Sequence, residues 1–185
     1  RHWGRGVDAV RFHPEKRDPA LRRQWDRSGR KKIVGFVGRL AAEKGVHRLV
    51  SLRGRRDIQL VIVGDGPSRP ELEELMPSAV GLARAYASLD LFVHAGEFET
   101  FCQAIQEAQA SGVPTIGPRA GGPVDLIQER YNGLLLDVDT FTRDLPVAAE
   151  WILHRDRLDQ LRHNARTSVA NKTWEALCEQ LLGYY

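Results

Sequence analysis

The chain has 185 residues, of which 42% are hydrophobic and 28% are charged, and its net charge is +3. This length and composition are typical of one soluble globular domain that is large enough to fold without a metal or disulfide staple. No apolar stretch approaches the ~20 residues that span a bilayer, and no charged-then-apolar leader stands at the amino end, so neither a membrane span nor secretion is expected.

Apolar runs alternate with helical patterns, which predicts an α/β fold with a Rossmann-like parallel sheet and helices on both of its faces. Pro114 suggests that one strand begins there or lies at a sheet edge. Strands are expected at residues 33–37, 58–63, 91–93, 113–116 and 134–136. Helices are expected at residues 46–52, 71–75, 82–88 and 101–110, then after Gly121-Gly122-Pro123, and in a helical tail from Phe141 onward.

The first thirty residues differ from the rest of the chain. Gly4, Gly6 and Pro19 predict irregular backbone there. We therefore expect a connecting segment at residues 1–30 and an α/β domain at residues 31–185. A connecting segment of this kind suggests that the chain is a piece of a larger protein.

The strongest helical pattern begins near Phe101, where apolar residues recur at helical spacing up to Ala108. Thr100 and Gln103 fit a capping box, in which two side chains satisfy free backbone amides at a helix start. Ser111-Gly112 is expected to end this helix.

Ligands in open α/β sheets bind at the carboxyl ends of the strands. Four loops occupy that position in the predicted sheet, and all of them contain glycine or charged residues. They are residues 38–44, 64–67, 95–101 and 118–123. Their convergence predicts a ligand site more strongly than any single loop does.

Two cations, Arg39 and Lys44, follow the first strand. Such a pair suits a diphosphate because both charges can reach its non-bridging oxygens. The alternative is that both are solvated, or that Glu43 pairs with one of them.

Two carboxylates, Glu99 and Glu107, lie eight residues apart, or about 12 Å along a helix. Carboxylates accept hydrogen bonds from sugar and ribose hydroxyls, and the amides of Phe101 and Cys102 at a helix start favour a phosphate. This segment could therefore contact hexose, phosphate and ribose together. The alternative is an exposed helix with ordinary glutamates.

Other motifs are less specific. Gly64-Asp65-Gly66 has only part of a dinucleotide fingerprint, and Asp65 could simply cap the turn. His94, at a strand end, could act as a general base or be a structural hydrogen-bonding residue. Cys102 and Cys178 have no metal-ligand spacing and are interpreted as reduced thiols in a cytosolic protein.

Basic residues are concentrated in the first third of the chain. They could form a solvated face, or a surface that meets anionic lipid headgroups or other phosphates. A nucleic-acid partner is not expected, because aromatic residues do not alternate with these charges. The residues are Arg17, Arg22, Arg23, Arg27, Arg30, Lys31 and Lys32.

The loop motifs, in their order, resemble those of the retaining family 4 glycosyltransferases. Residues 99–107 match the Glu-x7-Glu spacing of that family. The resemblance covers nearly the whole chain. The other matching segments are residues 37–40 with 43–45, residues 63–67, residues 108–114, residues 121–123, and the linker-like residues 5–8 with Phe12 and Pro14.

This resemblance implies the carboxy-terminal, donor-binding half of a GT-B architecture and transfer of a hexose with retention of configuration. The implied catalytic residues are Arg39, Lys44 and Glu99. Arg39 and Lys44 would hold and stabilise the departing diphosphate, Glu99 would contact the hexose hydroxyls, and Glu107 would contact the ribose. No metal or other cofactor is implied, since cations and the helix start supply the positive charge. The implied donor-contacting residues are Gly38, Gly64, Gly66, Thr100, Phe101, Cys102, Glu107, Gly121 and Gly122.

Three departures from the family pattern stand out. Thr100-Phe101-Cys102 replaces Gly-Phe-Gly, which should change how closely the backbone approaches the sugar. Asp125 stands where a glutamate is more usual. After Met76 the chain runs directly toward the next helix, without the strand and loop that contact the base in such proteins, so the base preference is left open.

The variant motifs look most like mannosyltransferases that use GDP-mannose to make glycolipids, and also like sulfolipid-type transferases that use UDP-sugars. Two alternative classes remain. One is a sugar-nucleotide epimerase or hydrolase, and the other is a non-catalytic nucleotide-binding module. The expected partners are a nucleotide-diphosphate sugar and an amino-terminal acceptor-binding domain outside this chain. A cytoplasmic location is expected, with peripheral contact at the inner face of the membrane as a further expectation.

Overall fold

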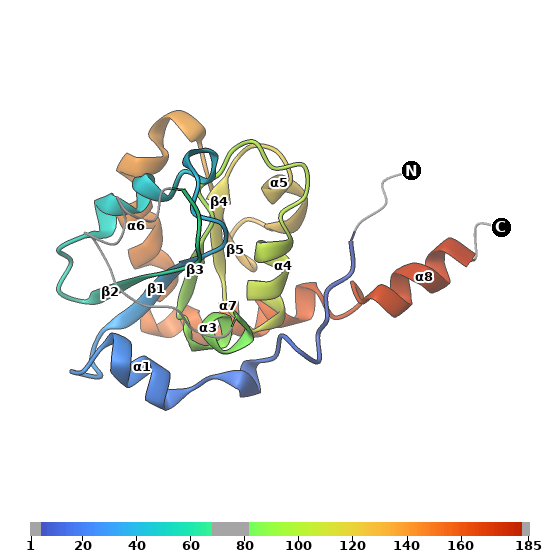
Figure 1. The fold of residues 1–185 in the computed structure, drawn as a ribbon, viewed down its shortest axis with the longest axis horizontal. Helices are drawn as coiled ribbons and strands as arrows, with labels where there is room; N and C mark the ends of the chain where they lie inside the picture. The colour runs from blue at the N-terminus through green and yellow to red at the C-terminus, as the bar shows by residue number, and fades with distance from the viewer. Residues whose placement is uncertain (1–4, 68–81, 183–185) are drawn as a thin grey trace.

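The computed structural model describes residues 5–67 and 82–182. A five-stranded sheet forms its centre, with the order β2-β1-β3-β4-β5 and parallel pairing throughout (Figure 1). This confirms the predicted α/β class. The strands are β1 Lys32–Val37, β2 Ile58–Val63, β3 Leu91–Val93, β4 Thr115–Pro118 and β5 Gly133–Leu136.

Helices cover both faces of the sheet, as the sequence predicts. Short 3₁₀ segments are η1 Pro14–Lys16, η2 Ala42–Lys44, η3 Val46–Leu52 and η4 Val138–Thr140. The α-helices are α1 Pro19–Trp25, α3 Leu82–Ser88, α4 Gln103–Ala110, α5 Pro123–Leu126, α6 Phe141–Leu153, α7 Arg155–Ser168 and α8 Trp174–Leu182. The expected helical tail is thus confirmed up to residue 182. In Figure 1, α8 projects away from the body of the domain.

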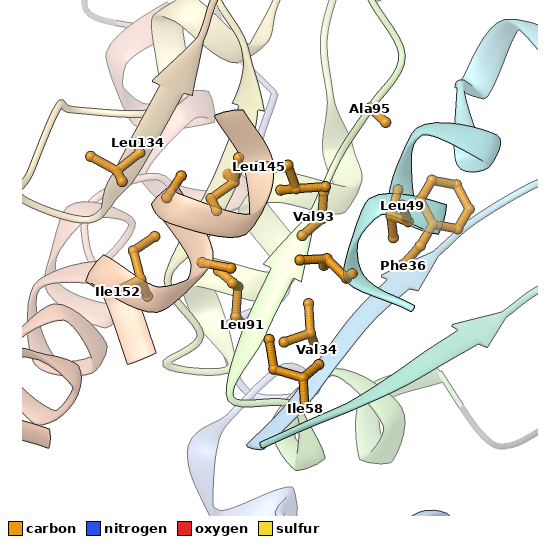
Figure 2. Close-up of a cluster of buried hydrophobic side chains, with 14 of the residues drawn as sticks. Val34, Phe36, Leu49, Ile58, Leu91, Val93, Ala95, Leu134, Leu145 and Ile152 are labelled. Carbon is orange, nitrogen blue, oxygen red and sulfur yellow. The ribbon is translucent and has the colours of Figure 1, made fainter. Parts of the chain in front are cut away.

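Two apolar cores form because successive strand residues point to opposite faces of the sheet. Val34 and Phe36 of β1 belong to the core under η3 and α6, whereas Ile33 and Val37 belong to the core under α3 and α4. Figure 2 shows the first core, where Leu145 of α6 faces the side chains of the central strands. A central strand buried on both faces explains the continuous apolar runs in the sequence.

Two expected elements differ in detail. Residues 46–52 form a 3₁₀ helix rather than an α-helix. The strand expected at residues 113–116 occupies 115–118 and lies inside the sheet, between β3 and β5. Pro114 directly precedes that strand, a position where proline is tolerated, and its carbonyl accepts a hydrogen bond from the Phe92 amide at 3.0 Å.

The expectation of irregular backbone before residue 30 is wrong at Pro19–Trp25, which forms helix α1. Asp18 is its N-cap and accepts hydrogen bonds from the amides of Ala20 and Leu21, while Pro19 occupies the first turn. The Asp-Pro pair is the local signal for this helix. The helix expected at residues 71–75 and the unusual passage after Met76 lie outside the described residues.

Candidate functional site

The first two candidate loops are bonded to each other at the carboxyl ends of β1 and β2. The Gly38 amide donates to the Val63 carbonyl at 3.0 Å, and the Leu40 amide donates to the Asp65 carbonyl at 2.9 Å. A Cβ at Gly64 would lie 1.9 Å from the Gly38 carbonyl oxygen, so only glycine permits this approach. The glycines of these loops therefore have a clear structural role.

The other two loops, after β3 and β4, are also joined. The Gly122 amide donates to the Glu99 carbonyl at 2.6 Å. Gly121 has φ +57°, and a Cβ there would lie 2.4 Å from the same carbonyl oxygen. This contact holds the backbone of Glu99 against the start of α5.

An ion pair between Lys44 and Glu99 connects the two pairs of loops. These residues lie 55 positions apart, and the structure brings them together from the loops after β1 and β3. Their side chains are 25% and 19% exposed, so the pair is accessible to a ligand without being fully solvated. The structure thus joins two of the three residues to which the resemblance gives catalytic roles.

Arg39, the third of these residues, pairs with Glu43, four residues later in the same loop. Their side chains are 61% and 47% exposed. This is the alternative that the sequence left open for this cation. A pair so exposed contributes at most ~1 kcal/mol, so a diphosphate could displace Glu43 at little cost.

Glu107, on α4, has partners of its own. Its carboxylate accepts a hydrogen bond from the Tyr86 hydroxyl on α3. Burial raises the pKa of Glu107, although Tyr86 and the nearby Arg11 favour its charged form. Tyr86 is missed by sequence reasoning, because a tyrosine within an apolar helix face has the pattern of a core residue.

His94 and Cys102 form a buried hydrogen-bonded pair beneath the Glu99 loop. His94 Nε2 lies 3.0 Å from the Gly96 carbonyl oxygen, which can only accept, so Nε2 carries the proton. The neutral Nδ1 then accepts from the Cys102 thiol at 3.3 Å. Burial lowers the pKa of His94 to about 4 and raises that of Cys102 to about 12. This favours the structural interpretation of His94.

The predicted capping box is wrong. Helix α4 begins at Gln103, with Cys102 as an N-cap that makes no side-chain capping bond. The Gln103 side chain instead donates to the Gly6 carbonyl at 3.1 Å. The helix starts late because the preceding backbone follows the loop bonded to Gly122. Within the described part of the chain, the amides of Thr100, Phe101 and Cys102 donate no backbone hydrogen bond.

Arg48 is a second residue that the sequence did not single out. Its guanidinium donates to the Ala95 carbonyl at 3.0 Å and to Glu97 at 3.1 Å, which anchors the loop after β3. A hollow of about 150 Å³ lies here, between η2–η3 and the loop after β3, which includes the exposed Phe98. Nothing in the local sequence distinguishes Arg48 from the neighbouring surface arginines.

The described ranges hold no group of three histidine, cysteine or acidic side chains that could bind a metal ion. Over the same ranges, none of the helices combines the length and the apolar character that crossing a membrane requires. Cys102 is buried and Cys178 is exposed, and both are free thiols.

Residues 31–154 match the protein family described as glycosyl transferases group 1. A GDP-mannose-dependent alpha-mannosyltransferase from Corynebacterium glutamicum is 66% identical over all of this chain, which spans 46% of that relative. One of the same name from Mycolicibacterium smegmatis is 53% identical over 99% of this chain and 50% of its own length.

The fold of sucrose-phosphate synthase from Thermosynechococcus elongatus superposes with a TM-score of 0.81 at 26% identity. That match covers 98% of this chain and 50% of the synthase. The chain therefore belongs to the group 1 glycosyltransferase family and has the fold of one half of a GT-B enzyme. It spans about half the length of the curated relatives that it matches.

Proposed function

We propose that this chain is the donor-binding half of a retaining mannosyltransferase that takes mannose from GDP-mannose. The observation that carries the proposal is the Lys44–Glu99 pair, which two loops place at the carboxyl edge of the sheet. The names of the two relatives with high identity support mannose as the sugar and GDP as the leaving group.

The proposed donor site exchanges charge partners when it binds its ligand. The donor diphosphate attracts Lys44 away from Glu99 and Arg39 away from Glu43, because charge-assisted bonds to phosphate are stronger than exposed ion pairs. The carboxylate of Glu99 is then free to accept hydrogen bonds from the hexose hydroxyls. In the reaction, Arg39 and Lys44 stabilise the negative charge that develops on the departing diphosphate.

Backbone groups complete this proposed site. The amides of Thr100, Phe101 and Cys102 line the sugar and phosphate, and the glycine loops, residues 38–44, 64–67 and 118–123, lie against the nucleotide. Glu107 accepts hydrogen bonds from the ribose hydroxyls. That role requires it to share its carboxylate with Tyr86, or to release the tyrosine when the donor binds.

Calorimetric titration with GDP, GDP-mannose, UDP and UDP-glucose tests the proposal. We expect GDP-mannose and GDP to bind, with the uridine compounds weaker. Preference for UDP-glucose would instead support a UDP-sugar-dependent transferase of the same family. If none of the four binds, the donor-site proposal is rejected. Release of free mannose or GDP without an acceptor would support the hydrolase alternative.

Single substitutions test the individual roles. Arg39→Ala and Lys44→Ala should each weaken GDP binding by at least ~1.5 kcal/mol, typical of charge-assisted contacts. Glu99→Ala should reduce the extra affinity of GDP-mannose over GDP, because the hexose contact is lost. GDP itself should bind no more weakly, because the substitution also releases Lys44. Glu107→Ala should weaken both ligands alike. Lys16, an exposed cation of η1, provides the control, and Lys16→Ala should leave every affinity unchanged.

Glu43→Gln gives a test with the opposite sign. It removes the carboxylate that holds Arg39 and leaves the rest of the loop intact. GDP should then bind up to about fivefold more tightly, the value of one exposed ion pair. Weaker binding would mean that Glu43, rather than Arg39, faces the ligand.

The remaining parts of the proposal concern the whole protein. Residues 1–30 connect this domain, residues 31–185, to an amino-terminal domain that binds a lipid or glycan acceptor. The retaining transfer occurs in the cytoplasm, at the inner face of the membrane, and the isolated domain turns over negligibly. An assay that compares the chain alone with the chain joined to the amino-terminal half of a relative tests this division.

A further inference from the structure

One edge of the domain has far more positive charge than the rest. Residues 22–32 and 53–57 together contain nine lysines and arginines and two acidic residues, whereas the whole chain has a net charge of only +3. These segments are the second half of α1, the start of β1 and the turn between η3 and β2. These elements lie together on the left side of the domain in Figure 1, away from both termini.

The basic residues of the first third of the chain have two different roles in the structure. Arg17 and Arg22 point inward and pair with the buried Asp90, at 2.8 and 3.0 Å. Their charge is therefore used to hold α1 against the sheet. Arg23, by contrast, is exposed and makes no ion pair within the described residues.

Lys31 connects this region to a second group of cations. It lines a hollow of about 270 Å³ beside Arg22 and Arg23, and it also lines one of about 330 Å³ beside Arg53 and Arg56. Arg53 and Arg56 are exposed, and they likewise make no ion pair within the part of the chain that is described. We define the basic edge as Arg23, Lys31, Arg53 and Arg56. It extends from α1 to the turn between η3 and β2, because Lys31 lines both hollows.

Apolar side chains lie in the same hollow as the cations. The 330 Å³ hollow is open between η3 and the edge strand β2, and its lining includes Leu52, Leu60 and Ile62. Val50, which also lines it, is 51% exposed. A surface for a purely ionic ligand would not need this apolar component, but the interface of a bilayer presents phosphates and hydrocarbon together.

We propose that the basic edge docks onto an anionic lipid bilayer. Arg23, Lys31, Arg53 and Arg56 contact lipid phosphates, and Val50 with the apolar hollow meets the upper part of the acyl chains. The lack of aromatic residues among these cations argues against a nucleic-acid strand. Lys31 and Arg56 lie just before the parallel strands β1 and β2, so the basic edge lies at the amino ends of these strands, opposite the Lys44–Glu99 loops. The docking assigns a surface to the membrane location proposed above, and its test requires no sugar donor.

Sedimentation with lipid vesicles tests the proposal on the 185-residue chain. We expect binding to vesicles of phosphatidylcholine and phosphatidylglycerol, little binding to phosphatidylcholine alone, and release at high salt. Arg56→Gln should lower the partition coefficient about fivefold, and Arg53→Gln with Arg56→Gln about 25-fold. Val50→Ser, as a single substitution, should also lower the partition coefficient, but without changing its salt dependence. All three positions are exposed, and circular dichroism checks that each variant is folded.

Arg130→Gln is the matched control. Arg130 is an exposed arginine just before β5, the strand at the opposite end of the sheet order from β2. It should change vesicle binding less than twofold, although it removes the same charge. An equal loss with Arg130→Gln would overturn the assignment to this edge, as would equal binding to both kinds of vesicle. Tight binding to duplex DNA that Val50→Ser leaves unaltered would overturn the lipid assignment.

Discussion

Replacing Asp90 by asparagine should strongly destabilise the domain. Asp90 is 2% exposed, and its carboxylate accepts hydrogen bonds from Arg17 at 2.8 Å, Arg22 at 3.0 Å, Arg162, and the Ile33 amide at 2.7 Å. Asn keeps the shape of the side chain but removes the charge that balances three arginines. It also replaces one accepting oxygen with a donating NH₂ group that faces other donors.

Removing one partner of a buried ion pair costs about 3–5 kcal/mol. We expect a value near 3 kcal/mol, because the three arginine side chains remain 23–34% exposed and Arg17 keeps its bonds to the Ala87 and Leu89 carbonyls. For a domain of this size that corresponds to a melting temperature lower by roughly 6–12 °C. Urea denaturation and thermal melting at neutral pH measure both quantities.

Asp159→Asn is the matched control, because Asp159 contacts the same Arg162 at 3.7 Å but its side chain is 92% exposed. Its cost should be below ~0.5 kcal/mol. Burial alone would raise the pKa of Asp90, but the Ile33 amide, Arg17 and Arg22 lower it below its ordinary value. The stabilisation is therefore present above about pH 4 and disappears as pH falls through the folded-state pKa. Equal costs for the two variants would refute this reasoning.

Three further predictions concern the candidate site. At pH 8 Cys178 should react rapidly with a thiol reagent while Cys102 reacts only on unfolding, because Cys102 is buried and its pKa is raised to about 12. The imidazole NMR signals of His94, whose pKa is lowered to about 4, should not titrate between pH 5.5 and 8. Because the unfolded histidine binds its proton near pH 6.5, the stability of the folded state should fall as pH drops below that value. Gly121→Ala should cost about 2 kcal/mol more than Gly29→Ala by urea denaturation, because both positions have positive φ but only at Gly121 would the Cβ meet a backbone carbonyl. Each assignment would be contradicted by its opposite result: rapid reaction of both thiols, titration of His94 in this pH range, or equal free-energy costs for the two glycine substitutions.

Several features follow from local sequence alone, because they depend on neighbouring residues. The five strands are apolar runs bounded by turn residues, and their positions are predicted with a shift of two residues at β4. The four glycine-containing or charged loops follow from the same pattern, because parallel strands place their carboxyl ends along one edge. Helix α1 could have been predicted as well, since Asp18 and Pro19 form a local start signal.

Other features depend on strand order and helix packing, which no local pattern specifies. The sequence could name Lys44 and Glu99 separately, but only the arrangement of β1 beside β3 brings them into an ion pair. The expected capping box failed for the same reason, because the contact with Gly122 sets the path of the chain before α4.

Charge shows the same division between sequence and structure. Composition and spacing identify a basic amino-terminal third, and the Glu-x7-Glu segment identifies candidate donor contacts. The tertiary structure decides that Arg17 and Arg22 neutralise a buried carboxylate, while Arg53 and Arg56, from a later segment, join Lys31 at the surface. Sequence alone therefore determined the elements and the family of this protein, because both depend on residue order. Folding determined which charges meet, because that depends on distances between residues far apart in the chain.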